Sequence, residues 1–204
     1  MMKKLVLIAL ITAPILILSC SGGKSNNEKR VVVMASGKLT VTDKTVEIDP
    51  SMSHNEQDLV FTDDKLTLTV KSTAGTSKTF DLTENGVYVL NLQTDTLTGG
   101  LVNYGATGRA GSITAEQRDK IIDSTEQLLL GKNASDANGT YFLPPFTIKK
   151  VSTKANTKII GSFKGIPYSN SADETGSVPD VIKFSTNKEK RETLKELDSQ
   201  KIKI

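Results

Sequence analysis

Three residues capable of catalytic or metal-binding chemistry alternate along one polar segment: His54, Glu56 and Asp58. Side chains two positions apart share a face of a β-strand, so in a strand these three would lie together. One imidazole and two carboxylates could hold a divalent metal, or His54 could act as a general base. The serines and asparagine at positions 51, 53 and 55 instead indicate a solvated loop between hairpins. We therefore treat the three residues as weak metal candidates and expect no catalytic site.

A second reactive residue, Cys20, is the only cysteine, and it closes an apolar N-terminal segment. Lys3 and Lys4 form a short positive region ahead of the apolar run 5–18. That run is too short for a comfortable membrane-spanning helix. Its end, Ile17-Leu18-Ser19-Cys20, combines an aliphatic residue, a tolerant position, a small residue and a cysteine.

This four-residue end resembles the lipobox of bacterial lipoproteins. The resemblance implies a signal peptide over residues 1–19 and a diacylglyceryl thioether on Cys20, which becomes the first residue of the mature chain. Two or more acyl chains, such as palmitate, would give a stable membrane anchor. Ser21 stands where an aspartate favours retention in the inner membrane of enteric bacteria. We therefore expect a lipid-anchored cell-envelope protein, in the outer membrane rather than the inner one.

The anchor limits the remaining chemistry of the chain. An acylated Cys20 leaves no free thiol and no disulfide. Loss of Lys3 and Lys4 leaves 24 basic against 23 acidic side chains. A nearly balanced charge does not favour nucleic acid as a partner. Residues 20–30 comprise the acylated cysteine and a polar tether with an end-to-end distance of roughly 15–20 Å.

After residue 30, aliphatic residues largely alternate with threonines and charges, as in strands with one buried and one exposed face. Two-residue separators at Asp43-Lys44 and Asp63-Asp64 favour tight antiparallel hairpins, as does Asn85-Gly86. The segment 87–92 is apolar on both faces, which predicts a central strand. Strands are predicted at residues 31–34, 38–42, 45–49, 58–62, 65–70, 79–82, 87–92, 100–104, 141–151, 158–163 and 181–184.

One helix interrupts these strands. Thr114 and Gln117 form a capping-box pattern, an apolar stripe follows, and Gly131 is placed to end the helix. We predict a mainly β domain over residues 31–184, an antiparallel meander forming a sandwich or open barrel with this one packed amphipathic helix. Residues 185–204 are expected to form a polar helical or frayed tail with a short C-terminal helix.

A glycine-rich string at residues 105–111, Gly-Ala-Thr-Gly-Arg-Ala-Gly, is the strongest cofactor signal. It resembles the phosphate loop of dinucleotide-binding relatives of short-chain dehydrogenases. That loop opens a βαβ unit, however, whereas here an antiparallel meander precedes it and a polar loop follows the helix. We therefore expect a loop joining sheet and helix, and no cofactor.

Tyrosines supply the candidate recognition patch. Tyr104, Tyr141 and Tyr168 all lie near predicted loops and could meet at one end of the sheet. The chain has no tryptophan, which disfavours a carbohydrate-binding surface built on stacked aromatic rings. We expect a non-catalytic binding or assembly component that holds an envelope protein with its loops and sheet edges.

Two alternatives remain open. The first is an envelope hydrolase or metal-dependent enzyme that uses His54, Glu56 and Asp58. The second is a small-ligand carrier with an apolar pocket beneath the helix at 115–130, lined by Ile121 and Ile122.

Overall fold

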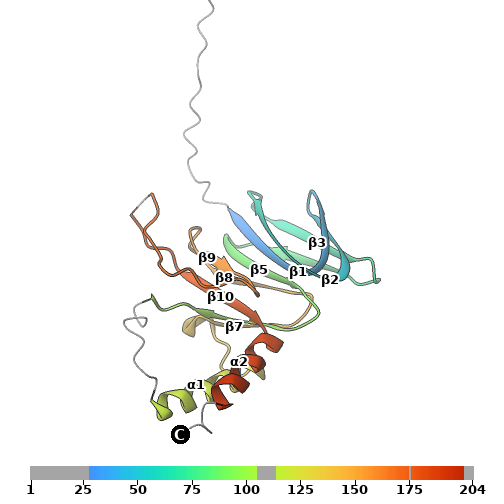
Figure 1. Cartoon of the computed structure of the whole chain (residues 1–204). Coiled ribbons are helices and arrows are strands. Elements are labelled where there is room, and N and C mark those ends of the chain that lie inside the picture. Colours follow the sequence, from blue (N-terminus) through green and yellow to red (C-terminus); the bar gives the residue numbers. More distant parts are fainter. Residues whose placement is uncertain (1–27, 105–113, 175, 200–204) are drawn as a thin grey trace, which may run out of the picture.

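The computed structural model describes residues 28–104, 114–174 and 176–199 (Figure 1). In this part of the chain, ten strands form two sheets and two α-helices lie together at one end of the molecule. The predicted mainly β class, with a packed helix and a C-terminal helix, is confirmed. Cys20, the lipobox and the glycine-rich string at 105–111 lie outside the described residues.

The first sheet has six strands in the order β4-β3-β2-β1-β5-β8. In chain order, these strands are β1 (Lys29–Thr42), β2 (Thr45–Phe61), β3 (Leu66–Ser72), β4 (Ser77–Leu82), β5 (Gly86–Leu92) and β8 (Thr147–Ser152). The sheet curls into a nearly closed, barrel-like shape. The ends of its edge strands approach across the seam, where Lys78 Nζ donates to the Phe146 carbonyl and Lys150 pairs with Glu84.

The second sheet has four strands in the order β7-β6-β10-β9. They are β6 (Leu97–Leu101), β7 (Thr140–Leu143), β9 (Lys158–Ile160) and β10 (Val181–Thr186). Pro144-Pro145 separates β7 from β8, so the predicted bent strand at 141–151 becomes two edge strands in different sheets. The helical elements are α1 (Ala115–Leu129), the 3-10 helix η2 (Asp136–Asn138) and α2 (Asn187–Ser199).

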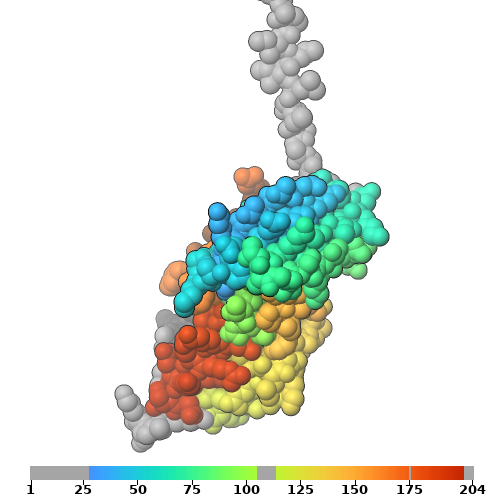
Figure 2. Space-filling model, turned by 90° about the vertical axis from the view of Figure 1, so that its right-hand side faces the viewer, coloured from blue at the N-terminus to red at the C-terminus, as the bar shows by residue number. Residues whose placement is uncertain are grey.

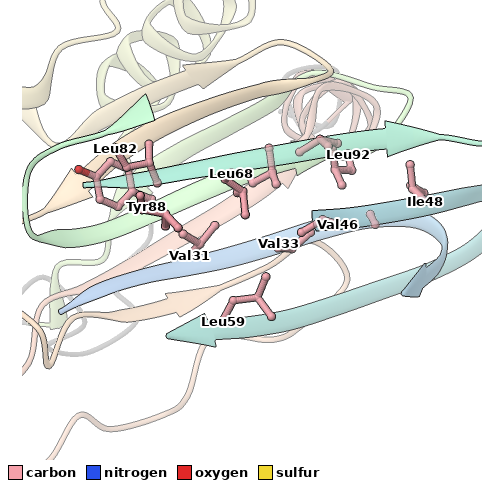
Figure 3. Close-up of a cluster of buried hydrophobic side chains, with 13 residues drawn as sticks. Val31, Val33, Val46, Ile48, Leu59, Leu68, Leu82, Tyr88 and Leu92 are labelled. Carbon is pink, nitrogen blue, oxygen red and sulfur yellow. The ribbon is translucent and has the colours of Figure 1, made fainter. Parts of the chain in front are cut away.

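Strands β1 and β5 separate two hydrophobic cores. Odd-numbered residues of β1, such as Val31 and Val33, enter the first core, which the curled sheet encloses (Figure 3). Val32 and Met34 point the other way, into a second core beneath the second sheet. The strand β5 divides in the same way, and all seven of its residues are buried. Its prediction as a central strand is therefore confirmed.

The strand pairing is mixed rather than wholly antiparallel. The pairs β1–β5, β2–β3 and β9–β10 are parallel. The hairpin at Asp43-Lys44 is confirmed, because it joins β1 directly to antiparallel β2. The hairpins predicted at Asp63-Asp64 and Asn85-Gly86 are wrong: the first connection leads to a parallel neighbour, and β5 pairs with β1 and β8 instead of β4.

A buried lysine accounts for both misread turns. Lys29 is fully buried, and its ammonium donates to the carbonyls of Asp63 and Asp64 at 2.7 and 3.0 Å and to Asn85 Oδ1 at 3.0 Å. A buried cation is tolerated only when such acceptors surround it. The two turn-like segments therefore wrap this ammonium. Lys29 and Arg30 also belong to β1, so the predicted tether boundary at residue 30 is too late.

The first two strands are longer than predicted. Gly37 joins the segments 31–34 and 38–42 into β1 through a bulge, with φ at 143° and the Asp49 carbonyl where a Cβ would stand. A side chain would clash there, which explains the glycine. The predicted loop around residues 51–57 is wrong, because these residues continue β2 as an exposed part of the strand.

The helices pack mainly on each other, and they also contact β7 and β10. The capping box of Thr114 and Gln117 is confirmed at the start of α1. Of the α1 stripe, only Leu129 is buried, and Ile121 is 43% exposed. This exposure does not fit a carrier pocket enclosed beneath α1. No described helix is long and apolar enough to cross a bilayer.

Candidate binding site

A pocket of about 510 Å³ lies where five separate segments meet. Its lining comes from Ser36 of β1, the bulged part of β2, the β5–β6 connection, the segment after β9 and the junction of β10 with α2. On the face shown in Figure 2, the cyan atoms of β2 lie beside the green β5–β6 connection and the red atoms of α2. The lining residues are Ser36, Pro50, Ser51, Met52, His54, Gln93, Thr94, Asp95, Phe163, Thr186 and Lys188.

The β5–β6 connection is held by a fully buried asparagine, Asn91. Its amide nitrogen donates to the carbonyls of Asp95 and Leu143 at 3.0 and 2.8 Å, and its Oδ1 accepts from the Gln93 backbone at 2.9 Å. Asp95 in turn accepts from the backbone N–H of Lys188 at 2.9 Å, in the first turn of α2. These hydrogen bonds attach the β5–β6 connection, which lines the pocket, to α2.

His54 and Glu56 form a hydrogen-bonded pair at the pocket. The distance from His54 Nε2 to Glu56 Oε1 is 3.0 Å, and Gln93 Nε2 lies 3.4 Å from His54 Nδ1. Gln93 also donates to the buried Ser162 hydroxyl at 2.9 Å. When the Gln93 amide donates to Nδ1, the proton of the neutral ring is on Nε2 and faces Glu56. Both ring nitrogens then have protein partners, and neither is directed into the open pocket.

Phe163 forms one wall in a backbone conformation that is unusual for a large residue, with φ at 65°. Its ring meets the His54 ring edge to face, with centroids 5.0 Å apart and an interplanar angle of 74°. Its backbone N–H donates to Glu189 Oε1 at 2.9 Å. The other Glu189 oxygen accepts from the Thr186 N–H at 2.7 Å, so one carboxylate caps α2 and holds this wall.

The Glu56 carboxylate is largely enclosed at the site. Its side chain is 10% exposed, between His54 and the ammonium of Lys164. Gly161 permits this arrangement because the carboxylate occupies the space that a Cβ would need. Behind it, the Lys183 ammonium donates to the carbonyls of Gly161 and Lys164 at 2.5 and 2.7 Å. Burial lowers the Lys183 pKa from its ordinary value, although Glu189 and Glu56 oppose that effect.

Two large apolar side chains stand exposed at the mouth of the pocket. Met52 is fully exposed and Phe163 is 68% exposed. Further along the same segment as Phe163, Ile166 is 50% exposed and Tyr168 is fully exposed. The site therefore combines polar groups that already have protein partners with apolar groups that face solvent.

The predicted candidates separate into different places. His54 and Glu56 come together as expected for a strand, whereas Asp58 pairs with Arg30 at 3.5 Å. Among residues 28–104, 114–174 and 176–199, no group of three or more His, Cys, Asp or Glu side chains could hold a metal ion.

The three tyrosines do not form the predicted patch. Tyr141 belongs to the second core, where it is 4% exposed and its hydroxyl donates to the Val151 carbonyl at 2.8 Å. Tyr141 was predicted to lie near a loop, but it belongs to β7 and its side chain faces inward. Tyr104 is half-buried just after β6, and only Tyr168 is fully exposed.

Most of the residues that build the site could not be recognised from the sequence. Asn91 carried a signal, since an amide at a central, doubly buried strand position must find hydrogen-bond partners, and Gln93 follows that strand directly. Nothing near Phe163 distinguishes it from an ordinary core phenylalanine. Its role depends on Glu189 and His54, which are distant in sequence.

Comparisons with known proteins gave no match: no protein-family model, no curated protein and no solved structure is significantly similar to this chain.

Proposed function

We propose that this chain is a lipid-anchored, non-catalytic component of a bacterial cell envelope that binds another envelope protein at the pocket mouth. The observation that carries this proposal is the exposure of Met52 and Phe163 beside one pocket. Large apolar groups gathered at a rigid concave site favour a protein partner. The internal hydrogen bonds of the pocket support a surface that keeps its shape on binding.

The anchor part of the proposal rests on the lipobox-like residues that end at Cys20. Acyl chains on this residue would hold the domain at the outer membrane through a short polar tether. Growth with labelled palmitate should label the wild-type protein, and Cys20→Ala should abolish both the label and recovery in the membrane fraction. Equal labelling of both proteins would refute the anchor.

Site-directed photocrosslinking in intact envelopes tests the binding part. A photoreactive residue replaces Met52 in one variant and Leu130 in a control, because Leu130 is also exposed but lies at the end of α1. We expect a discrete protein adduct from position 52 that is absent or much weaker at position 130. Identical adduct patterns from the two positions would contradict binding at this pocket.

A second candidate function is hydrolysis that uses the His54–Glu56 pair. It is supported by their 3.0 Å contact beside the pocket, an arrangement in which a carboxylate orients a general base. Catalysis would require His54 Nδ1 to leave Gln93. His54→Ala separates the two functions: a folded variant that keeps the position-52 adduct and the cellular phenotype favours binding, and loss of phenotype with an intact adduct favours catalysis.

A further inference from the structure

One long strand edge remains open beside the proposed site. The strand β2 pairs with β1 along its length but with β3 only over residues 45–48. The last backbone bond on that side runs from the Thr73 N–H to the Ile48 carbonyl. From Asp49 to Phe61, no described strand covers the outer edge of β2.

The final eight residues of this edge are regular. Residues 54–61 pair one to one with residues 36–29 of β1, whereas residues 51–53 form a bulge after Pro50. Prolines and bulges protect an edge from further pairing, and residues 54–61 contain neither. The edge strand β4 has only six residues, and β7 and β9 have four and three. Strand β8 is also an edge strand, but it lies at the seam of the first sheet, where its Lys150 pairs with Glu84 beyond the end of β4.

The backbone register identifies the outward groups. Gly86 N–H donates to the Glu28 carbonyl, so even-numbered residues of β1 face β5 and odd-numbered residues face β2. Their partners Asn55, Gln57 and Leu59 then face β1. The N–H and C=O groups of Glu56, Asp58 and Val60 consequently point away from the sheet.

The side chains along this edge define the complementary partner. Residues 54–61 carry two carboxylates and neither lysine nor arginine; Glu56 already pairs with Lys164, so Asp58 is the exposed carboxylate. Asp58 is 58% exposed despite its contact with Arg30, and Val60 is 56% exposed. On the opposite face, Leu59 and Phe61 border the first core. A strand lying beside β2 would therefore match it with basic residues on one face and aliphatic residues on the other.

We propose that this edge accepts an extended segment of the partner protein, with alternating basic and aliphatic residues, as an added β-strand. The inference rests on the binding function proposed above and names its partner chemistry. A second copy of β2 is disfavoured as the occupant, because antiparallel self-pairing centred on this edge would place Glu56 opposite Asp58 of the second copy.

A synthetic peptide of alternating lysine and valine tests the inference, with a glutamate–valine peptide as its matched probe. We expect the lysine peptide to bind the full chain and the glutamate peptide not to bind. Binding should slow hydrogen exchange at the outward amides of Glu56, Asp58 and Val60, and added salt should weaken it. Equal binding of both peptides, or unchanged exchange at these amides, would overturn the proposal.

Variants assign the binding to the edge. Val60→Pro removes an outward N–H without removing a bond to β1, and it should abolish peptide binding. Asp58→Lys should weaken binding about tenfold, while Glu192→Lys makes the same charge change on exposed α2 and should not. Unfolding curves verify that each variant is folded. If Asp58→Lys and Glu192→Lys weaken binding equally, only net charge matters and the proposal fails.

Self-association is the competing outcome. The chain ends in Lys201-Ile202-Lys203-Ile204, which has the alternation expected of the partner. Light scattering on the full chain should show a monomer; an oligomer that Lys201→Glu/Lys203→Glu dissolves would make a second copy the occupant and overturn the proposal. If the lysine peptide does not bind but the photocrosslinked adduct at position 52 persists, strand addition is rejected and the proposed function is not affected.

Discussion

The two cores on either side of β1 and β5 differ in how they end. The first core holds thirteen buried hydrophobic residues inside the curled sheet, and its polar end is a single buried ammonium, that of Lys29. The second core is apolar at its centre but gives way to buried polar groups at the pocket, among them Asn91, Gln93 and Ser162. Apolar burial stabilises a fold without fixing fine geometry, whereas buried polar groups require particular partners. The first core therefore mainly stabilises the domain, whereas the second also shapes a site.

Truncation of either core should produce the largest effect. Leu90→Ala in the first core and Phe184→Ala in the second are each expected to destabilise the domain by about 2–5 kcal/mol. Because β1 and β5 belong to both cores, urea denaturation should still give a single transition. Two separate transitions in either variant would show that the cores unfold independently.

Removal of Asn91 should affect the pocket side selectively. Asn91→Ala leaves the Leu143 and Asp95 carbonyls and the Gln93 N–H without this partner, and it is expected to cost about 2–3 kcal/mol. Amide exchange should accelerate at Gln93 more than at Leu68, which lies in the first core. The exposed Asn138→Ala serves as control. Uniform acceleration across both cores would remove the distinction between them.

Lys183 should give the pocket side a pH dependence. Burial lowers the pKa of its ammonium below the ordinary 10.5, so the unfolded chain binds more protons between the folded pKa and 10.5. Stability therefore rises with pH through that window. Lys183→Met should reduce this rise, with Lys190 retaining a contribution of the same sign because burial also lowers its pKa. Denaturation at several alkaline pH values measures the slope; an unchanged slope would contradict the assignment.

The smallest effect on stability is expected at Phe163, although its effect on binding should be large. Phe163→Gly relieves a left-handed backbone and removes an exposed ring, so stability should stay within about 1 kcal/mol of the wild type. Phe163→Ala keeps the unfavourable φ and should be less stable than the glycine variant. Both should lose the position-52 adduct. Undiminished crosslinking in both variants would mean that this wall does not contact the partner.

Regular alternation allowed much of the fold to be predicted. The exposed and buried positions of β3, the two-faced burial of β5 and the capping box of α1 each follow from local patterns. The pairing of the strands could not be predicted in this way, because a turn-like sequence describes only the conformation of its own residues. Asn85-Gly86 has the sequence of a hairpin turn, yet its asparagine binds the distant Lys29 ammonium.

The site was predictable only where it is local. The alternation of His54 and Glu56 correctly placed both on one strand face, and their contact followed. Their further partners Gln93, Lys164 and Phe163 lie 39 or more positions from His54 or Glu56 along the chain. Those contacts depend on how the second sheet packs on the first, and no spacing in the sequence encodes that arrangement.

The buried Lys29 ammonium has a mechanical consequence. If Cys20 holds the chain at a membrane and a partner holds the other end of the domain, tension enters the fold at the first residue of β1. There the ammonium ties the strand to three acceptors, and β1 is hydrogen-bonded to neighbours on both sides. A pull along this strand would strain many bonds at once instead of peeling them one by one. Resistance to forced unfolding is governed by the unfolding rate, so Lys29→Met should lower the rupture force measured by pulling from the N-terminus.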